Sequence, residues 1–504
     1  MLQIRLYLTI GTNGHSSQAI SASMFSILLD GIHLPLIGTT DLTSYLLTLF
    51  ITCFIAVLGF EVVNGFHDTA NAVATVIYTN TLKPSIAIIW SGLCNFLGVF
   101  VIGTAVAMSL LQLVPLDRIL NLPVEVGAYL VIAILLASII WNLSTWYIGL
   151  PLSSSHTLIG AMIGAGLGFS MYYGGNVNWE KAKEIGLSLL LSPIIGFAGS
   201  SLLMYLEKKY IKSDALFHAP VNKDDRPPLP IRILLVITCA LVSFFHGSND
   251  GQKGVGLLML VLIAFLPLRY MLNPDIAPAR LHNLLTTTQH TLRQGEAMAI
   301  SAKTTRQKSD WLRVEKEVAQ AQKQALNAPV NSVKGRYDLR KQVQTIVIHL
   351  RTLTNSPSPA LSATYQQTLL NQTKALEQTT DFAPVWVLIA ISLALGLGTT
   401  VGWKRIVITV GERIGAENLT YAQGATAELV AASTIGLSTL VGLPVSTTHV
   451  LSSGVAGTMV ASGGIKNLNY STLKHIATAW ILTLPVAILL ALLFFTLFYH
   501  LILS

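Results

Sequence analysis

Charged side chains are scarce in this sequence: only 11% of its 504 residues are Asp, Glu, Lys or Arg, against about 25% in a typical soluble domain. Six stretches have no charged residue and are each as long as the roughly 20 residues that cross a bilayer as a helix: 84–116, 126–179, 185–206, 382–403, 429–465 and 476–504. None shows the sustained polar–apolar alternation of a membrane β-barrel. The composition therefore excludes a soluble globular protein and predicts an all-α polytopic membrane protein.

Cysteine is also rare. Cys53, Cys94 and Cys239 lie in apolar runs, where a thiol behaves as a small hydrophobic group. Three such residues make no framework for disulfides or for a metal. The N-terminal segment 1–41 holds Arg5 and a short apolar patch but no clear cleavage site, so we expect it to stay in the mature chain.

Positive charge is unevenly placed. The net charge is +8, and the polar segment from Tyr270 to Thr380 holds 14 Lys or Arg against 7 Asp or Glu. We interpret it as a soluble, partly helical insert on the periplasmic side, either a solvated loop or a weak electrostatic collector for an anionic substrate. The predicted divisions are 1–41, a first transmembrane repeat 42–206, a basic cytoplasmic linker 207–231, the start of a second repeat 232–269, the insert 270–381, and the rest of the second repeat 382–504.

Two motifs occur twice. GLPLSSSHTLIGAMIGAG begins at Gly149 and GLPVSTTHVLSSGVAGTM begins at Gly442, while GFHDTANA from Gly65 is a weaker match to GSNDGQKG from Gly247. The second pair aligns Asp68 with Asp250. Paired motifs in one membrane chain predict a transporter built from two inverted-topology repeats.

The placement of Lys and Arg residues agrees with ten membrane-spanning segments, and twelve segments are the alternative. We expect them at about 42–80 (its motif stretch broken or re-entrant), 84–112, 126–148, 154–173, 186–206, 232–269, 382–403, 420–441, 448–464 and 475–501. With the N-terminus outside, the inner loops collect Lys83, the 207–232 cluster, Lys404, Arg405, Arg413, Lys466 and Lys474. The short outer loops hold Arg118, Lys181 and Lys183. This asymmetry follows the positive-inside rule.

The Gly-Leu-Pro-x-Ser-x-x-His motifs have the chemistry of helix starts. Proline suits a first helical turn, and Ser or Thr can cap free backbone amides. A helix that starts inside the membrane directs its unpaired N–H groups and the positive end of its dipole at one point. Two such starts would form a donor-rich pocket for phosphate, sulfate or a carboxylate. The alternative is that these hydroxyls only join helices.

Acidic residues inside apolar segments are the second set of candidates. Asp68 and Asp250 stand among Gly, Asn and Ser residues that could break a helix, and Glu61 and Glu428 are similar. Carboxylates and exposed carbonyls suit a monovalent cation, a proton or a metal complex, whereas a purely structural carboxylate is the alternative. Four histidines could titrate near neutral pH, and no single one is assigned to coupling: His67, His156, His246 and His449.

Four longer segments resemble the inorganic phosphate transporter (Pit) family, most of all its bacterial low-affinity branch: NGFHDTANAVATVIYT, FFHGSNDGQKGVGLLMLVLI, WNLSTWYIGLPLSSSHTLIGA and GLPVSTTHVLSSGVAGTM. The resemblance covers about 45–265 and 382–500. It implies a secondary transporter that binds phosphate near the membrane midplane. The family's Gly-Ala-Asn-Asp pattern maps to 65–68 and 247–250, and its phosphate site maps to Ser153, Ser154, Ser155, Thr157, Ser446, Thr447 and Thr448.

Two positions depart from the family pattern. The family carries an Asn three residues after its Asp. This Asn is present as Asn71 in the first repeat, but the second repeat has Lys253 at the matching position. The second departure is Asn95, which stands where many members carry Glu. An ammonium one turn beyond Asp250 could take the place of a monovalent cation, and the bacterial branch implies proton symport, often of a neutral divalent metal–phosphate complex. The predicted cation- and proton-coupling residues are Asp68, Asn71, Asn249, Asp250, Lys253 and Glu428.

The resulting hypothesis is a proton-coupled phosphate symporter of the bacterial inner membrane. A sodium-coupled phosphate or sulfate permease, an anion channel and an intramembrane Ser/His enzyme are the alternatives. The enzyme is disfavoured because a hydrolase needs one nucleophile with its base, whereas Ser and His occur here in two copies at helix starts. We expect no cofactor, resident metal or nucleic-acid partner; phosphate, protons, metal–phosphate complexes and lipid are the expected partners, and a homo-oligomer is left open.

Overall fold

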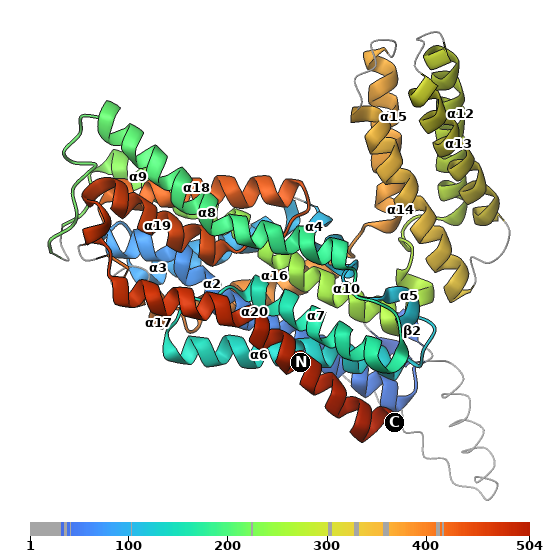
Figure 1. Cartoon of the computed structure of the whole chain (residues 1–504), viewed down its shortest axis with the longest axis horizontal. Coiled ribbons are helices and arrows are strands. Elements are labelled where there is room, and N and C mark those ends of the chain that lie inside the picture. Colours follow the sequence, from blue (N-terminus) through green and yellow to red (C-terminus); the bar gives the residue numbers. More distant parts are fainter. Residues whose placement is uncertain are drawn as a thin grey trace, which may run out of the picture. The chain divides into compact units, whose positions relative to one another are not determined.

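The computed structural model describes residues 32–34, 38–40, 42–101, 103–222, 225–300, 305–326, 332–355, 362–409, 414–415 and 418–504 (Figure 1). The side chains of the two strands and of residues 68–71, 295–300, 305–308, 326 and 355 lie outside this description. The chain divides into two units, 1–49 and 50–504. In the first, β1 (Ile32–Leu34) pairs antiparallel with β2 (Gly38–Thr40); the rest of the predicted segment 1–41 is not described.

Apolar helices dominate the first half of the chain. They are α2 (Ser44–Tyr78), α3 (Pro84–Val101), α4 (Ala105–Leu111), α5 (Leu116–Ile119), α6 (Val124–Ile148), α7 (Ser154–Tyr173) and α8 (Trp179–Tyr210). The predicted crossing 84–112 is wrong in detail, because α3 ends at Val101 and α4 is a separate short helix.

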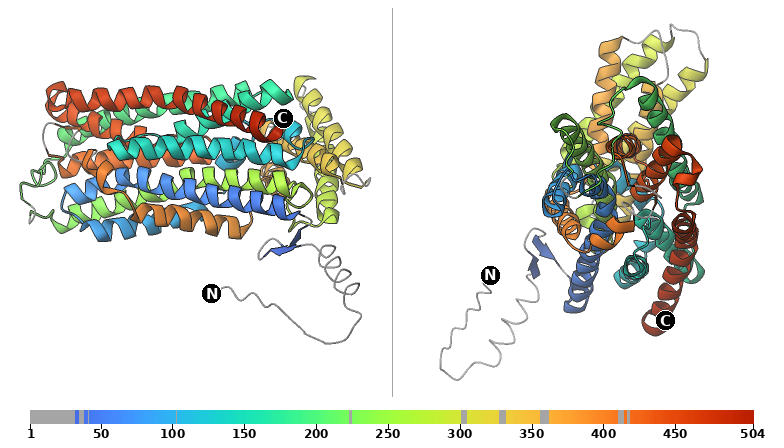
Figure 2. Two further views of the ribbon diagram at one scale, coloured as in Figure 1. Left: turned by 90° about the horizontal axis from the view of Figure 1, so that it is seen from below. Right: turned by 90° about the vertical axis from the view of Figure 1, so that its left-hand side faces the viewer.

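The second half has the same character apart from the polar insert. Its membrane helices are α9 (Leu229–His246), the π-helical turn η1 (Gly247–Gly251), α10 (Gln252–Phe265), α16 (Val385–Thr400), α18 (Tyr421–Leu440), α19 (Thr447–Gly463) and α20 (Tyr470–Phe498). Short connecting elements are α11 (Pro267–Tyr270), α17 (Lys404–Ile408), η4 (Ile465–Asn467) and η5 (Tyr499–Leu503). Within residues 50–504 the long membrane helices lie side by side and run along one direction, whereas the helices of the polar insert do not follow it (Figure 2).

Six helices of the described residues are long and apolar enough to cross a membrane, or seven if α15 and α16, bent by 74°, form one span. α7, α18 and α19 are not among them. The chain is thus a multi-pass α-helical membrane protein, while ten crossings and an inverted repeat stay predictions.

Neither Asp68 nor Asp250 stands at a helix break. α2 is one helix of 35 residues, and α9, η1 and α10 follow one another without a gap. Gly65 supports close packing instead, because a Cβ there would lie 2.4 Å from the carbonyl oxygen of Leu395 in α16. The expected break or re-entrant turn in α2 is therefore wrong, since this glycine lets two helices approach closely.

The helices that carry the repeated motifs are packed crosswise between the two halves. α7 packs along α20, and α19 packs along α8. Each motif helix also packs against the helix before it, α7 against α6 and α19 against α18. Both motif helices are therefore held by elements from both ends of the chain, which positions their N-termini.

The polar insert is more helical than a solvated loop. It consists of α12 (Pro278–Ile300), α13 (Thr305–Leu326), α14 (Val333–Asn355) and α15 (Ala363–Thr380), which form a bundle (Figure 1). The bundle has its own apolar core, which includes Leu285, Val318, Ile346 and Leu376. The insert is more ordered than its sequence indicates, because many Gln, Thr and Lys residues dilute the helical apolar spacing.

Candidate functional site

The two motif helices begin with the same cap. Ser153, at φ −94° and ψ 106°, accepts a hydrogen bond of 3.2 Å from the backbone N–H of His156. Ser446, at φ −96° and ψ 103°, accepts one of 3.1 Å from the N–H of His449. Each cap satisfies one orphan amide of the first turn. The remaining first-turn amides and the helix dipoles favour an anion at both starts.

These two helix starts touch each other. Ser155 Oγ of α7 donates a hydrogen bond of 2.8 Å to the carbonyl oxygen of Val445, immediately before α19. The rings of His156 and His449 lie with centroids 4.5 Å apart, and His449 stacks at 3.9 Å on Trp480 of α20. The motifs are therefore parts of one site, although they are separated by nearly 300 residues.

A buried ion pair lies against this junction. Lys253 Nζ is 2.7 Å from Asp250 Oδ2, and neither side chain is exposed. Lys253 also donates to Ser155 Oγ of α7, while Thr447 Oγ1 of α19 donates to Asp250 Oδ1 at 3.2 Å. The predicted phosphate-site hydroxyls and the predicted coupling residues thus meet, with Lys253 on the α7 side and Asp250 on the α19 side.

Asn249 is hydrogen-bonded to the chain around the start of α19. Its Nδ2 donates to Thr439 Oγ1 at 2.9 Å and to the carbonyl oxygen of Leu443 at 3.1 Å, and its Oδ1 accepts from the N–H of Val445 at 3.2 Å. Both ends of the amide are thus bonded to the segment between α18 and α19. Asn249 positions that segment in the structure, and its predicted role in cation or proton coupling stays a prediction.

The other predicted hydroxyls are all buried, but they differ in their contacts. Ser154 Oγ has no hydrogen-bond partner among the described residues. Thr157 Oγ1 donates to the carbonyl oxygen of Ser153 in its own helix, at 3.2 Å. Thr448 is buried in the first turn of α19. Ser154 therefore has a hydroxyl hydrogen that is free to bond to an anion at these caps, whereas Thr447 donates its own to Asp250.

Glu428 lies apart from the ion pair. Its carboxylate accepts hydrogen bonds from Thr75 Oγ1 of α2 and, at 2.5 Å, from Thr238 Oγ1 of α9. Thr238 precedes Asp250 by twelve residues, about 18 Å along a helix at 1.5 Å per residue. Glu428 thus joins three helices at a second place in the membrane part, and its predicted role in coupling stays a prediction.

The first-repeat acid cannot be compared with the second. Asp68 and Asn71 lie within α2, but their side chains are outside the described residues. Glu61 of α2 is buried and accepts from Asn64 Nδ2 at 3.3 Å. The roles predicted for Asp68 and Asn71 therefore stay predictions.

Two contacts were not foreseen from the sequence. His246 Nδ1 lies 2.9 Å from Asn95 Oδ1, and its Nε2 lies 3.8 Å from Asp250 Oδ2. Asn95 thereby reaches the site through His246. A second such contact is the stacking of Trp480 on His449. The four-residue spacing of His246 and Asp250 was a sequence signal that these two side chains lie close together. No sequence signal indicated the contact of Trp480 with His449.

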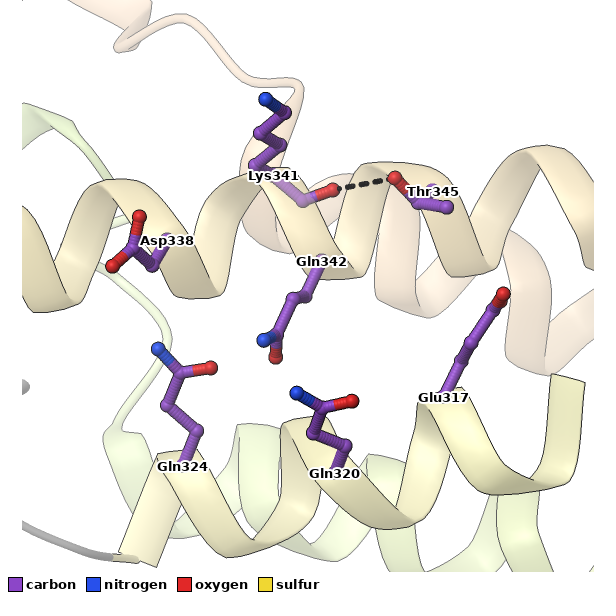
Figure 3. A pocket seen from close by; sticks show the side chains of 7 residues that line it. All are labelled: Glu317, Gln320, Gln324, Asp338, Lys341, Gln342 and Thr345. Atoms are coloured by element: carbon purple, nitrogen blue, oxygen red, sulfur yellow. Dashed lines mark hydrogen bonds between the residues drawn. The ribbon is translucent and has the colours of Figure 1, made fainter. Parts of the chain in front are cut away.

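A cleft of about 580 Å³ lies in the insert bundle (Figure 3). The side chains of α13 and α14 that line it are Glu317, Gln320, Gln324, Asp338, Lys341, Gln342 and Thr345. Two acids and one lysine line it, so this cleft is unsuited to collecting an anion. Arg340, also on α14, is buried outside this cleft. Its burial lowers the pKa of the guanidinium, and the negative charge of Asp381 acts in the opposite direction.

Comparison with protein families decides the identity. The phosphate transporter family, PHO4, matches residues 64–491, which include both motif helices and the Asp250–Lys253 pair. The chain belongs to this phosphate transporter family. The expected resemblance is therefore confirmed.

Individual relatives agree with this assignment. The "Low-affinity inorganic phosphate transporter PitA" of Escherichia coli K12 is 39% identical over 496 residues, covering 91% of this chain and 98% of that protein. The "Low-affinity inorganic phosphate transporter" of Buchnera aphidicola subsp. Acyrthosiphon pisum is 38% identical over 490 residues, with the same coverage. A solved structure entitled "The sodium-dependent phosphate transporter" matches with TM-score 0.52 at 20% identity, covering 90% of this chain and 100% of that one. At this identity it supports the fold alone.

Proposed function

We propose that this protein is a secondary active transporter that carries inorganic phosphate into the cell together with protons, across the bacterial inner membrane. One observation supports this most: two Ser-capped helix starts meet at a buried carboxylate–ammonium pair. Amides and hydroxyls supply anion donors, and the charged pair supplies a group that can exchange a proton. The relatives' names supply phosphate as the anion.

The anion site uses dipoles rather than arginine. The six uncharged stretches contain no Arg, so phosphate must be held by first-turn amides, by hydroxyls such as Ser154 and Thr447, and by Lys253. Such donors in a low-dielectric site bind a charged ligand more strongly than in water. A free phosphate ion and its divalent-metal complex both expose oxygens to such donors, and we propose that both are carried.

Sodium-coupled uptake of phosphate or sulfate is the main alternative. Lys253 argues against sodium at Asp250, because its ammonium already lies 2.7 Å from the carboxylate and offers no oxygen ligand. A channel would show no accumulation, and the two-copy arrangement of Ser and His offers no distinct nucleophile for an enzyme.

Reconstituted vesicles test the proposal. Purified protein should accumulate radiolabelled phosphate above the outside concentration when the outside is acidic, and a protonophore should abolish this accumulation. Excess unlabelled phosphate should compete far better than sulfate. Equilibration without accumulation would indicate a channel, and equal competition by sulfate would remove the substrate assignment.

A further inference from the structure

Lys253 is held between an acid and a predicted phosphate ligand. Its ammonium contacts Asp250 one turn earlier in the same helical segment and donates to Ser155 at the start of α7. Both charged side chains are fully buried. A phosphate at the α7 start would therefore meet the ammonium directly, without any movement of α10.

Charge balance decides what must happen when an anion arrives. The pair Asp250–Lys253 is neutral as a unit, and an uncompensated charge in a buried site is strongly unfavourable. Adding a monovalent dihydrogen phosphate would leave one negative charge. Protonation of Asp250 removes that charge, because the neutral acid releases the ammonium to pair with phosphate. The loaded site is then neutral again.

We propose, given the transport function above, that Lys253 exchanges its partner in each cycle, from the Asp250 carboxylate to phosphate, while Asp250 takes up the coupled proton. The proton binds to a carboxylate oxygen of Asp250 and forms an O–H bond, and the ammonium keeps its three protons. On release the steps reverse: Asp250 loses its proton, and Lys253 returns to the carboxylate. One proton then accompanies one dihydrogen phosphate, and the net movement is electroneutral.

The neighbouring titratable groups allow this assignment. His246 of α9 is bonded to Asn95 of α3 and lies 3.8 Å from Asp250. From the motif helices, His156 is bonded to Ser153, and His449 stacks between His156 and Trp480. From α2, the Glu61 carboxylate lies against Gly254, where a Cβ would be 2.4 Å from its Oε1. Among the acids whose side chains the structure describes, Asp250 is the one whose charge is directly compensated by the ammonium that phosphate would recruit.

The test is calorimetry of inorganic phosphate binding to the full-length protein in detergent at pH 6, repeated in buffers of different ionisation enthalpy. At this pH phosphate is mostly dihydrogen phosphate, so proton uptake reports on the protein. The unmutated protein should take up about one proton for each phosphate bound. Asp250→Asn should still bind phosphate, with no proton uptake.

Variants of the lysine complete the test. Lys253→Gln should weaken phosphate binding by roughly 10- to 150-fold, the range for losing one hydrogen bond to a charged group, and Lys253→Arg should keep most of the affinity. Lys208→Gln, an exposed lysine at the end of α8, should change nothing. Binding by the unmutated protein without proton uptake, or unchanged proton uptake in Asp250→Asn, would overturn the exchange. Unaltered affinity in Lys253→Gln would do the same.

These outcomes are separable from the transport proposal. If unmutated protein accumulates phosphate under a pH gradient but binds it without proton uptake by Asp250, symport stands and the exchange fails. If it shows no proton-driven accumulation in vesicles, the transport proposal itself fails. Should Lys253→Gln not fold, Lys253→Arg and Asp250→Asn still decide, because the first keeps the charge and the second removes only the proton acceptor.

Discussion

Ser155 donates its hydroxyl hydrogen to the carbonyl oxygen of Val445, at 2.8 Å, and so fastens the start of one motif helix to the start of the other. The same hydroxyl accepts from Lys253. One short side chain thus links both motifs to the buried ion pair. A movement that separates α7 from α19 must break this link.

Asp250 and Asp68 are expected to be essential for transport. Asp250→Asn and Asp68→Asn should each abolish phosphate uptake in vesicles while the protein still inserts, because an amide packs like the acid but cannot carry a proton. Membrane insertion is checked by size-exclusion chromatography of the purified variants. Near-normal uptake by either variant would remove that acid from the coupling site.

The hydroxyls of Ser154 and Thr447 should contribute to phosphate affinity. Ser154→Ala and Thr447→Ala each delete one donor to a charged ligand, which is worth about 1.5–3 kcal/mol, or roughly 10- to 150-fold in affinity. The matched control is Ser433→Ala, whose exposed hydroxyl bonds only within α18. Unchanged apparent affinity in both variants would move the anion site elsewhere.

The sequence predicted the local chemistry of the site better than its contacts. The repeated Pro and Ser residues indicated both helix caps, and the three-residue spacing placed Lys253 beside Asp250. The contact of Lys253 with Ser155 was not predictable in this way, because the partners lie on helices 98 residues apart. The contacts of Glu428 were not predictable for the same reason: an isolated acid in an apolar run does not reveal which helices face it.

Errors in the fold also had physical causes. Gly65 was interpreted as a helix breaker, yet it accommodates the carbonyl of Leu395 within a continuous α2. The insert was interpreted as mainly solvated, yet α12–α15 bury an apolar core of their own. In both cases a residue that weakens an isolated helix is compensated by tertiary packing.

The hydrogen bonds that the buried Glu428 accepts should stabilise the folded protein. Thr75→Val and Thr238→Val each leave the Glu428 carboxylate without one hydroxyl donor, and an unsatisfied buried group costs about 1–3 kcal/mol. We expect lower thermal midpoints for both variants in detergent. Thr478→Val is the control, because its exposed hydroxyl bonds only to Lys474 in the same helix. Midpoints equal to the control would show that these contacts contribute little.

The insert should depend on one arginine for its attachment. Arg340 of α14 is buried, and its Nη1 donates to the carbonyl oxygen of Met271 at 2.8 Å. Arg340→Met leaves that oxygen unpaired and should lower stability by about 1–3 kcal/mol. Arg351→Met, which removes an exposed pair with Glu377, should cost at most about 1 kcal/mol. Equal effects of the two variants on denaturant unfolding would contradict this role.

The coupling ion is the central claim, and it is tested most directly by imposing proton and sodium gradients separately on vesicles that contain the purified, unmutated protein. The account predicts that phosphate accumulates under an inward proton gradient without sodium, and that an inward sodium gradient at equal pH drives no accumulation. Strong accumulation under sodium alone, with no response to the pH gradient, would contradict it.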